Sequence, residues 1–205
     1  MIEVFLKGVG VGLAVAAPVG PIGLLCIRRS VAQGRAAGMA TGMGAATADA
    51  TYGLLVAAGF SATGLLMRHA SEMQLVGGLL ICILGVMTLR GFFAKTAPKP
   101  ADVPARSVLG AFASTYVLTL SNPMTILAFA GLVAGLGSAA SGSANAAYVL
   151  VAGVFLGSAL WWLFLVHAAL FARTRITPAA LRWLDLLAGG VLIVWGAKIA
   201  LSVGV

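Results

Sequence analysis

The sequence predicts an all-α integral membrane protein with about six transmembrane helices, arranged as two three-helix repeats of inverted topology whose first and fourth helices are broken. Composition predicts the membrane class: of the 205 residues 61% are hydrophobic and 9% are charged, and the mean hydropathy is +1.07. Soluble domains usually carry about 25% charged residues. Internal similarity and paired proline motifs predict the repeat and the two breaks.

Six apolar runs are long enough to cross a hydrocarbon core of about 30 Å. They lie near residues 4–27, 38–66, 73–93, 108–136, 146–171 and 183–203. The gaps between them are short, and one gap, 94–107, contains three prolines and alternating charges that predict a linker. We therefore divide the chain into a first repeat at 1–93, a cytoplasmic linker at 94–107 and a second repeat at 108–205.

Basic residues gather in alternate gaps. Ten of the thirteen follow the first, third or fifth span, namely Arg28, Arg29 and Arg35, then Arg90, Lys95, Lys99 and Arg106, then Arg173, Arg175 and Arg182. The positive-inside rule places these gaps in the cytoplasm and both termini on the periplasmic or extracellular side. Because orientation and lipid headgroups account for the net charge of +8, the bilayer is the expected partner and nucleic acid is not.

The two halves resemble each other. "LVGGLLICILG" at 75–85 in the third span is similar to "LLAGGVLIVWG" at 186–196 in the sixth, and each half opens with a span that contains proline. Because each half has an odd number of spans, the second enters the membrane in the opposite sense, as in many transporters. The alternative is that glycine- and leucine-rich helices resemble each other by composition alone.

The first span contains Pro18, Gly20, Pro21 and Gly23 within an otherwise apolar run. An unpaired backbone group in hydrocarbon costs several kcal/mol, so a break here must face protein or a water-filled cavity. Freed carbonyls can hold an ammonium group, and the N-terminus of a half-helix that begins near Pro21 can hold a carboxylate. The segment therefore predicts a site for a zwitterion, unless it is an ordinary proline kink.

Ser121, Asn122 and Pro123 occupy the corresponding place in the fourth span. The side chains of Ser121 and Asn122 add hydrogen-bonding groups beside the proline. Two broken helices in corresponding positions predict a substrate site near the membrane midplane, gated at the two breaks.

Asp49 lies deep in the second span, within "MGAATADATYG". A carboxyl inside a membrane helix is a functional candidate by default. Burial favours its protonated form and a cationic substrate favours its ionised form, so one carboxyl can exchange a proton for a substrate ammonium group. The structural alternative is a hydrogen bond to Thr47, Thr51 or Tyr52 that fixes helix packing.

Three further residues are candidates for the cavity wall: Tyr52, Trp161 and His167. His167 either relays a proton or bonds a carbonyl, and Trp161, like its neighbour Trp162, either lines the cavity or anchors and packs its helix.

Two scaffold features complete the pattern. Asp185 is expected to form an interfacial salt bridge with Arg182. Gly34, Gly38 and Gly42 recur every four residues, which predicts a close helix contact. Such glycine faces pair helices within a chain or between two copies, so both a monomer and a homodimer stay open.

The chain resembles the LysE/RhtB translocator family of amino-acid exporters, in the segments 18–53 and 114–129. Pro18, Gly20 and Pro21 match the family's Pro-Gly-Pro element, Asn122 and Pro123 match its Asn-Pro element, and Asp49 matches its acidic position. The resemblance implies a bacterial inner-membrane carrier that exports amino acids or related zwitterions, driven by protons. Val19 is inserted and Ile22 follows, where many members have Asp or Gln, which leaves a less polar amino acid or another metabolite open.

Other functions fit the sequence less well. A redox carrier of the DsbD/CcdA type needs two cysteines that meet, but Cys26 and Cys82 both lie in the first half. A metal-ion carrier needs clustered ligands, and only Asp49 and His167 lie deep in spans. No nucleophile, base and orienting group occur together, so we expect no enzyme, cofactor or metal. A structural subunit stays an alternative to the transporter.

Overall fold

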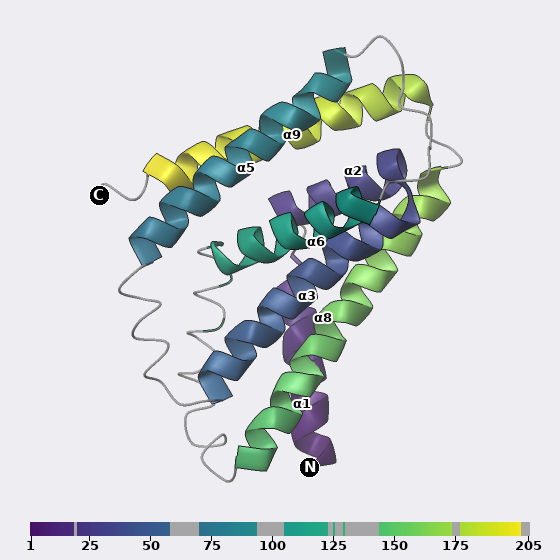
Figure 1. Cartoon of the computed structure of the whole chain (residues 1–205). Helices are drawn as coiled ribbons and strands as arrows, with labels where there is room; N and C mark the ends of the chain where they lie inside the picture. Colours follow the sequence, from purple (N-terminus) through teal and green to yellow (C-terminus); the bar gives the residue numbers. More distant parts are fainter. Residues whose placement is uncertain are drawn as a thin grey trace.

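The computed structural model describes residues 1–18, 20–57, 70–93, 105–122, 125, 129, 144–173 and 177–201. Regular structure in these segments is entirely helical, which confirms the predicted all-α class. The described helices are α1 (Ile2–Ala16), α2 (Pro21–Gln33), α3 (Arg35–Ala57), α5 (Ala70–Phe93), α6 (Ala105–Leu120), α8 (Ala144–Arg173) and α9 (Pro178–Leu201) (Figure 1).

The first apolar run, expected to form one broken span, forms two helices, and the described part of the chain holds seven helices. α1 ends at Ala16 because Pro18 has no N–H to continue the helical hydrogen bonding. α2 begins at Pro21, in the first turn, where a missing N–H costs nothing. The two helices meet at 84°, and the predicted break of the first span therefore lies between Ala16 and Pro21.

Gly34 makes the turn from α2 into α3. Its φ of 92° lies in the left-handed region that favours glycine. The sequence interpretation that placed Arg28 and Arg29 in a gap between spans is wrong, because α2 continues through both residues to Gln33. The apolar run ends at residue 27, but α2 continues to Gln33. The guanidinium groups of Arg28 and Arg29 bind partners inside the protein.

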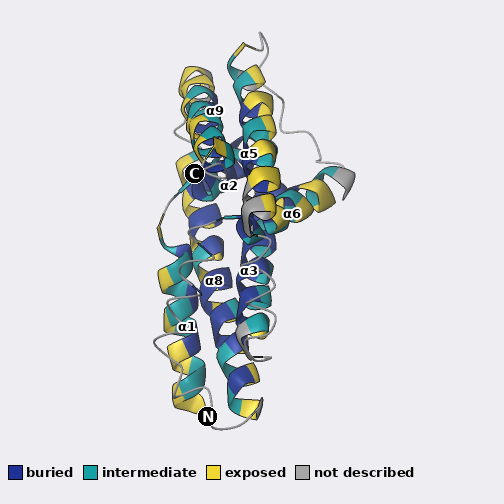
Figure 2. Ribbon diagram, turned by 90° about the vertical axis from the view of Figure 1, so that its left-hand side faces the viewer, coloured by how far each residue is buried: buried dark blue, intermediate teal, exposed yellow. Residues whose placement is uncertain are grey.

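Most described helices pack mainly on helices that are distant in sequence. α5 lies along α9, α1 lies along α8, and α3 lies between α6 and α8 (Figure 1). α2 contacts α3, α8 and α9. The buried residues run along the facing sides of α3 and α8 (Figure 2), so the core lies where the first and second parts of the chain meet.

Glycines permit the closest of these approaches. Gly8 and Gly12 of α1 face Gly153 and Gly157 of α8, and a Cβ at any of the four would collide with the backbone opposite. α5 and α9 use the same device. Small residues let helix backbones approach closely, which is how helices gain contact energy in lipid.

Two described helical segments are long and apolar enough to cross a membrane, Asn145–Arg173 and Arg182–Leu201, and the bent pair of α1 and α2 would make a third. Shorter apolar stretches occur at Leu75–Arg90 and Ser107–Leu120. The ends of α5, α8 and α9 lie within five residues of the predicted limits of the third, fifth and sixth spans. The second and fourth predicted runs, like most of the linker, extend outside the described residues, and a total of six spans stays a prediction.

Candidate functional site

A pocket lies where the break between α1 and α2 meets α3, α6 and α8. Pro18, Gly20, Pro21 and Gly23, the four predicted residues of the first break, all line it. Asp49 of α3 lines it as well. The pocket contains about 410 Å³ of space between atoms, part of which opens to the outside. The residues predicted from the first break and from the second span thus meet at one cavity.

The first turn of α2 forms one wall of this pocket. Pro21, Ile22 and Gly23 open the helix there, and the N–H groups in a first helical turn have no helical acceptor. The space beside Gly20 is open, since a Cβ built there would meet no atom within 4 Å. This wall is suited to a carboxylate because helix N-termini favour negative charge.

Asp49 is the one ionisable side chain among the lining residues that the structure describes. It is 3% exposed, and its Oδ2 accepts a hydrogen bond of 2.6 Å from Oγ of Ser158 in α8. A buried carboxyl with one neutral donor is suited to bind either a proton or a cationic group.

The three residues that we predicted as hydrogen-bond partners of Asp49 bond to other groups. Oγ1 of Thr47 donates to the Met43 carbonyl, and Oγ1 of Thr51 donates to the Thr47 carbonyl. The hydroxyl of Tyr52 donates to the carbonyl of Leu120. Sequence reasoning missed Ser158, because a serine in an apolar run usually bonds a carbonyl of its own helix.

Two other buried polar atoms belong to residues that line the pocket. Oγ1 of Thr119 in α6 and Nε1 of Trp162 in α8 have no hydrogen-bond partner among the described residues. The two residues are 4% and 7% exposed. Because an unsatisfied buried polar atom costs free energy, both atoms are suited to hydrogen-bond a polar ligand in this cavity.

The second predicted break reaches the same pocket in part. Asn122 lines it, together with Thr125. Ser121 is buried but does not line it, and instead packs against Gly77 of α5. Pro123 lies outside the described residues.

The remaining predicted residues lie away from the pocket. Tyr52 is buried and stacks on Phe129, with ring centroids 5.3 Å apart. Trp161 packs against Phe164, with ring centroids 5.6 Å apart. His167 is exposed, and its Nδ1 lies 2.8 Å from the Leu163 carbonyl of its own helix.

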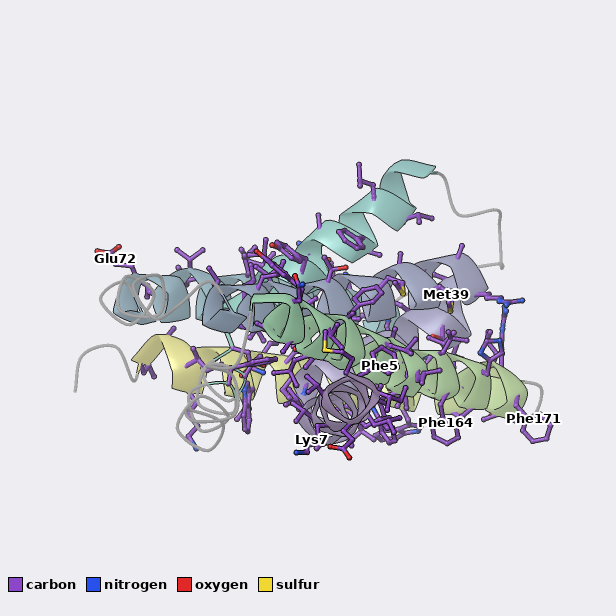
Figure 3. All side chains as sticks on the ribbon, turned by 90° about the horizontal axis from the view of Figure 1, so that it is seen from below. Phe5, Lys7, Met39, Glu72, Phe164 and Phe171 are labelled. Atoms are coloured by element: carbon purple, nitrogen blue, oxygen red, sulfur yellow. The ribbon has the colours of Figure 1, made fainter. Side chains whose placement is uncertain are left out.

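The outward direction of this part of α8 is visible in Figure 3. Phe164 and Phe171 point away from the other helices. His167, three and four residues from them, shares their face of the helix. Of the tryptophan pair, Trp162 lines the cavity and Trp161 does not.

The cysteines and acidic residues offer no second centre in the described part of the chain. The thiols of Cys26 and Cys82 are free and contact the carbonyls of Gly38 and Ile193. No group of three or more His, Cys, Asp or Glu side chains occurs among the described residues.

Comparison with known proteins places the chain in a family. Residues 13–203 match the family described as LysE type translocator. The chain is 28% identical over 200 residues to a protein of Bacillus subtilis (strain 168) named "Putative amino acid efflux protein YcgF", covering 95% of this chain and 93% of that protein. No solved structure gives a significant match. The family match spans nearly the whole chain, and the protein belongs to the LysE type translocator family.

Proposed function

We propose that this protein exports amino acids or related small zwitterionic metabolites across the bacterial inner membrane by proton antiport. One observation carries the proposal: Asp49 and the first turn of α2 line the same pocket. A buried carboxyl suits an ammonium group, and a helix N-terminus suits a carboxylate. Membership of a translocator family and similarity to a protein named for amino acid efflux support the same function.

The polar atoms of the pocket support a substrate with a carboxylate. The indole N–H of Trp162 and the hydroxyl of Thr119 are donors without protein partners among the described residues. Both would bond an anionic group held at the start of α2. The lining side chains other than Asp49, Thr119, Asn122, Thr125 and Trp162 are apolar, which agrees with a substrate whose side chain is small or weakly polar.

Asp49 supplies the coupling in this proposal. A carboxyl that is neutral when it holds a proton and ionised when it holds an ammonium group cannot carry both at once. Proton binding from outside therefore releases substrate, and substrate binding from the cytoplasm releases the proton. His167 takes no part in this proposal, because it is exposed, does not line the pocket, and its Nδ1 lies 2.8 Å from a carbonyl of its own helix.

Helix packing supports the proposed inverted repeat of 1–93 and 108–205. The opening helix of each half packs on the second helix of the other, α1 on α8 and α6 on α3. The equivalent helices face each other, α3 against α8 and α5 against α9. A pseudo-two-fold axis in the membrane plane would produce this exchange of partners.

Individual contacts support the same axis. Gly78 of α5 faces Gly196 of α9, and Gly85 faces Gly189. The internal similarity in sequence aligns Gly78 with Gly189 and Gly85 with Gly196, so each contact is the equivalent of the other. Rocking of one repeat against the other, about the breaks at Pro18–Gly23 and Ser121–Pro123, would then expose the pocket to either side. Charge counting loses Arg28 and Arg29, which bind inside the protein, but the other basic residues still support cytoplasmic loops after the first, third and fifth spans and both termini outside.

The test is transport by purified protein in liposomes. Labelled amino acids are screened for movement that follows an imposed pH gradient, with empty liposomes and protein in the absence of a gradient as controls. We expect movement of one chemical group of amino acids, against the proton flow. Absence of movement across the panel, in tight vesicles that contain folded protein, would contradict amino-acid export.

Asp49→Asn tests the coupling step. The variant keeps the size of the side chain but cannot exchange a proton, so gradient-driven accumulation should be lost. His167→Gln is the matched control, since it removes the other ionisable side chain predicted deep in a span and should retain full gradient dependence. Gradient-driven transport by Asp49→Asn at the wild-type rate would remove Asp49 from coupling.

A further inference from the structure

Ser158 binds Asp49 at the place where α3 crosses α8. Its hydroxyl is fully buried and donates to Oδ2 of Asp49 across the interface. Helical serines commonly donate to the carbonyl four residues earlier, as the buried Ser30 does to Cys26. Ser158 instead donates to a different helix. The two helices that it joins, α3 and α8, each follow the opening segment of their half.

The contacts on either side of this bond repeat each other. A Cβ at Gly42 of α3 would meet Cβ of Trp162 in α8 at 2.6 Å, and a Cβ at Gly53 of α3 would meet the side chain of Val151 in α8. Val151 lies 109 positions after Gly42, and Trp162 lies 109 positions after Gly53. Exchanging the two halves at this offset therefore turns one contact into the other.

The contacts of α3 and α8 with the opening helices give the same offset on the side of α3 and α8, while their partners Phe5 and Phe112 differ by 107 positions. Gly44 of α3 faces the carbonyl of Phe112 in α6, and Gly153 of α8 faces the carbonyl of Phe5 in α1. Gly153 also lies 109 positions after Gly44. Two independent interfaces thus define one correspondence between α3 and α8.

This correspondence brings Asp49 onto Ser158, because 49 and 158 also differ by 109. We infer that the two residues are the same position of the two repeats, that they meet on the pseudo-two-fold axis, and that Ser158 is the positioning residue of the transport carboxyl, with which it can exchange place. The inference rests on the proposed function, in which Asp49 couples substrate to protons.

A position on the pseudo-two-fold axis would let the Asp49–Ser158 pair serve both states of the carrier. In a carrier with inverted repeats, the inward- and outward-facing states differ by an exchange of the conformations of the two repeats. A group on the axis keeps the same position relative to both openings. Asp49 lines the pocket and Ser158 lies behind it, so the hydroxyl holds the carboxyl on the axis in either state.

Moving the carboxyl to the other repeat tests the inference. Asp49→Ser, Ser158→Asp and the double variant are reconstituted and compared by gradient-driven transport, after size-exclusion profiles and melting temperatures in detergent have shown that they fold. The double variant restores one carboxyl and one hydroxyl with their helices exchanged. We expect Asp49→Ser to lose coupled transport and Ser158→Asp, with two facing carboxyls, to be impaired. The double variant should exceed either single variant by about tenfold, because contacting positions are strongly coupled.

The other outcomes separate the two proposals. Full coupled transport by Asp49→Ser would remove Asp49 from coupling and overturn the inference together with that part of the proposed function. A folded double variant as inactive as Asp49→Ser would overturn the exchange of positions alone and leave the transport function standing.

Conservative variants of Ser158 decide the matter if the double variant does not fold. Ser158→Thr keeps the hydroxyl and should keep coupled transport, whereas Ser158→Ala should lower it. Ser30→Ala is the matched control, since it removes an equally buried serine hydroxyl that bonds only its own helix. Coupled transport by Ser158→Ala equal to that of Ser30→Ala would overturn the positioning role.

Discussion

Nε of Arg28 in α2 lies 2.7 Å from Oδ1 of Asp185 in α9, and this ion pair joins the first half of the chain to the last helix. The side chains are 14% and 5% exposed, so water screens the pair weakly. Our prediction from the sequence, a salt bridge between Asp185 and Arg182, is wrong. Arg182 donates to the carbonyl of Phe92, and its guanidinium lies over the Phe92 ring.

Asp185→Asn should destabilise the protein, because it leaves the partly buried charge of Arg28 without its partner. Breaking a fully buried pair costs about 3–5 kcal/mol, and this partly exposed pair should cost less, whereas removing both charges is often neutral. Melting in detergent should therefore show a loss for Asp185→Asn and recovery in Arg28→Gln/Asp185→Asn. A double variant no more stable than Asp185→Asn would contradict this account.

Arg29→Lys should destabilise the protein although it keeps the charge. Nη1 of Arg29 donates to Thr41, Ala111 and Thr115, each at 3.1 Å, and Nη2 donates to Ser114. This fork joins α2 to α3 and α6, and an ammonium group cannot reproduce it. Loss of two or more such bonds should cost about 1–3 kcal/mol, measured as thermal stability in detergent.

Arg35→Lys is the control for that change. Arg35 is exposed at the start of α3, so the same substitution there should leave the melting temperature nearly unchanged. An equal fall in melting temperature in both variants would show that the hydrogen bonds of Arg29 do not explain the loss of stability.

Gly157→Ala should weaken the contact between α1 and α8. A Cβ at this position would collide with the carbonyl of Val9, which is backbone and cannot move aside. Gly10→Ala is the matched control on the same helix pair, because a Cβ there would meet nothing within 4 Å. Melting in detergent should fall for Gly157→Ala and stay constant or rise for Gly10→Ala.

Thr119→Val and Trp162→Phe should each raise the KM for transport by about tenfold, because each removes a donor from the pocket. Thr119→Val nearly preserves the shape of the side chain, so the maximal rate should change less than KM in that variant; Trp162→Phe also removes one ring from the packed core, so its maximal rate is compared with that of Trp161→Phe. Trp161→Phe makes the same substitution one residue earlier, outside the lining, and should leave KM unchanged. An equal change of KM in Trp161→Phe and Trp162→Phe would contradict a substrate contact.

The local sequence predicted the features that arise from covalent chemistry. Pro18 and Pro21 lack N–H groups, so the end of α1 and the start of α2 follow from their positions. Asp49 stood out because a carboxyl within an apolar run must be buried. These residues line one pocket because the break and the carboxyl both need polar surroundings that lipid does not provide.

The rest depended on packing between distant segments. Arg28 and Arg29 were taken for the end of a span, since a charge in an apolar chain usually marks an interface. Their partners lie up to 157 positions away, and no local pattern indicates such contacts. Ser158 resembles any other helical serine until α3 lies against α8.

The glycine faces of α1 and α8 also constrain biosynthesis. Gly8 and Gly12 leave the ribosome early, but Gly153 and Gly157 are translated only after most of the chain has entered the membrane. Until then the face of α1 that carries Gly8 and Gly12 lacks its partner helix. The first half therefore cannot complete its packing until the second half has been translated. The helices do not reach their final contacts in the order in which they are made.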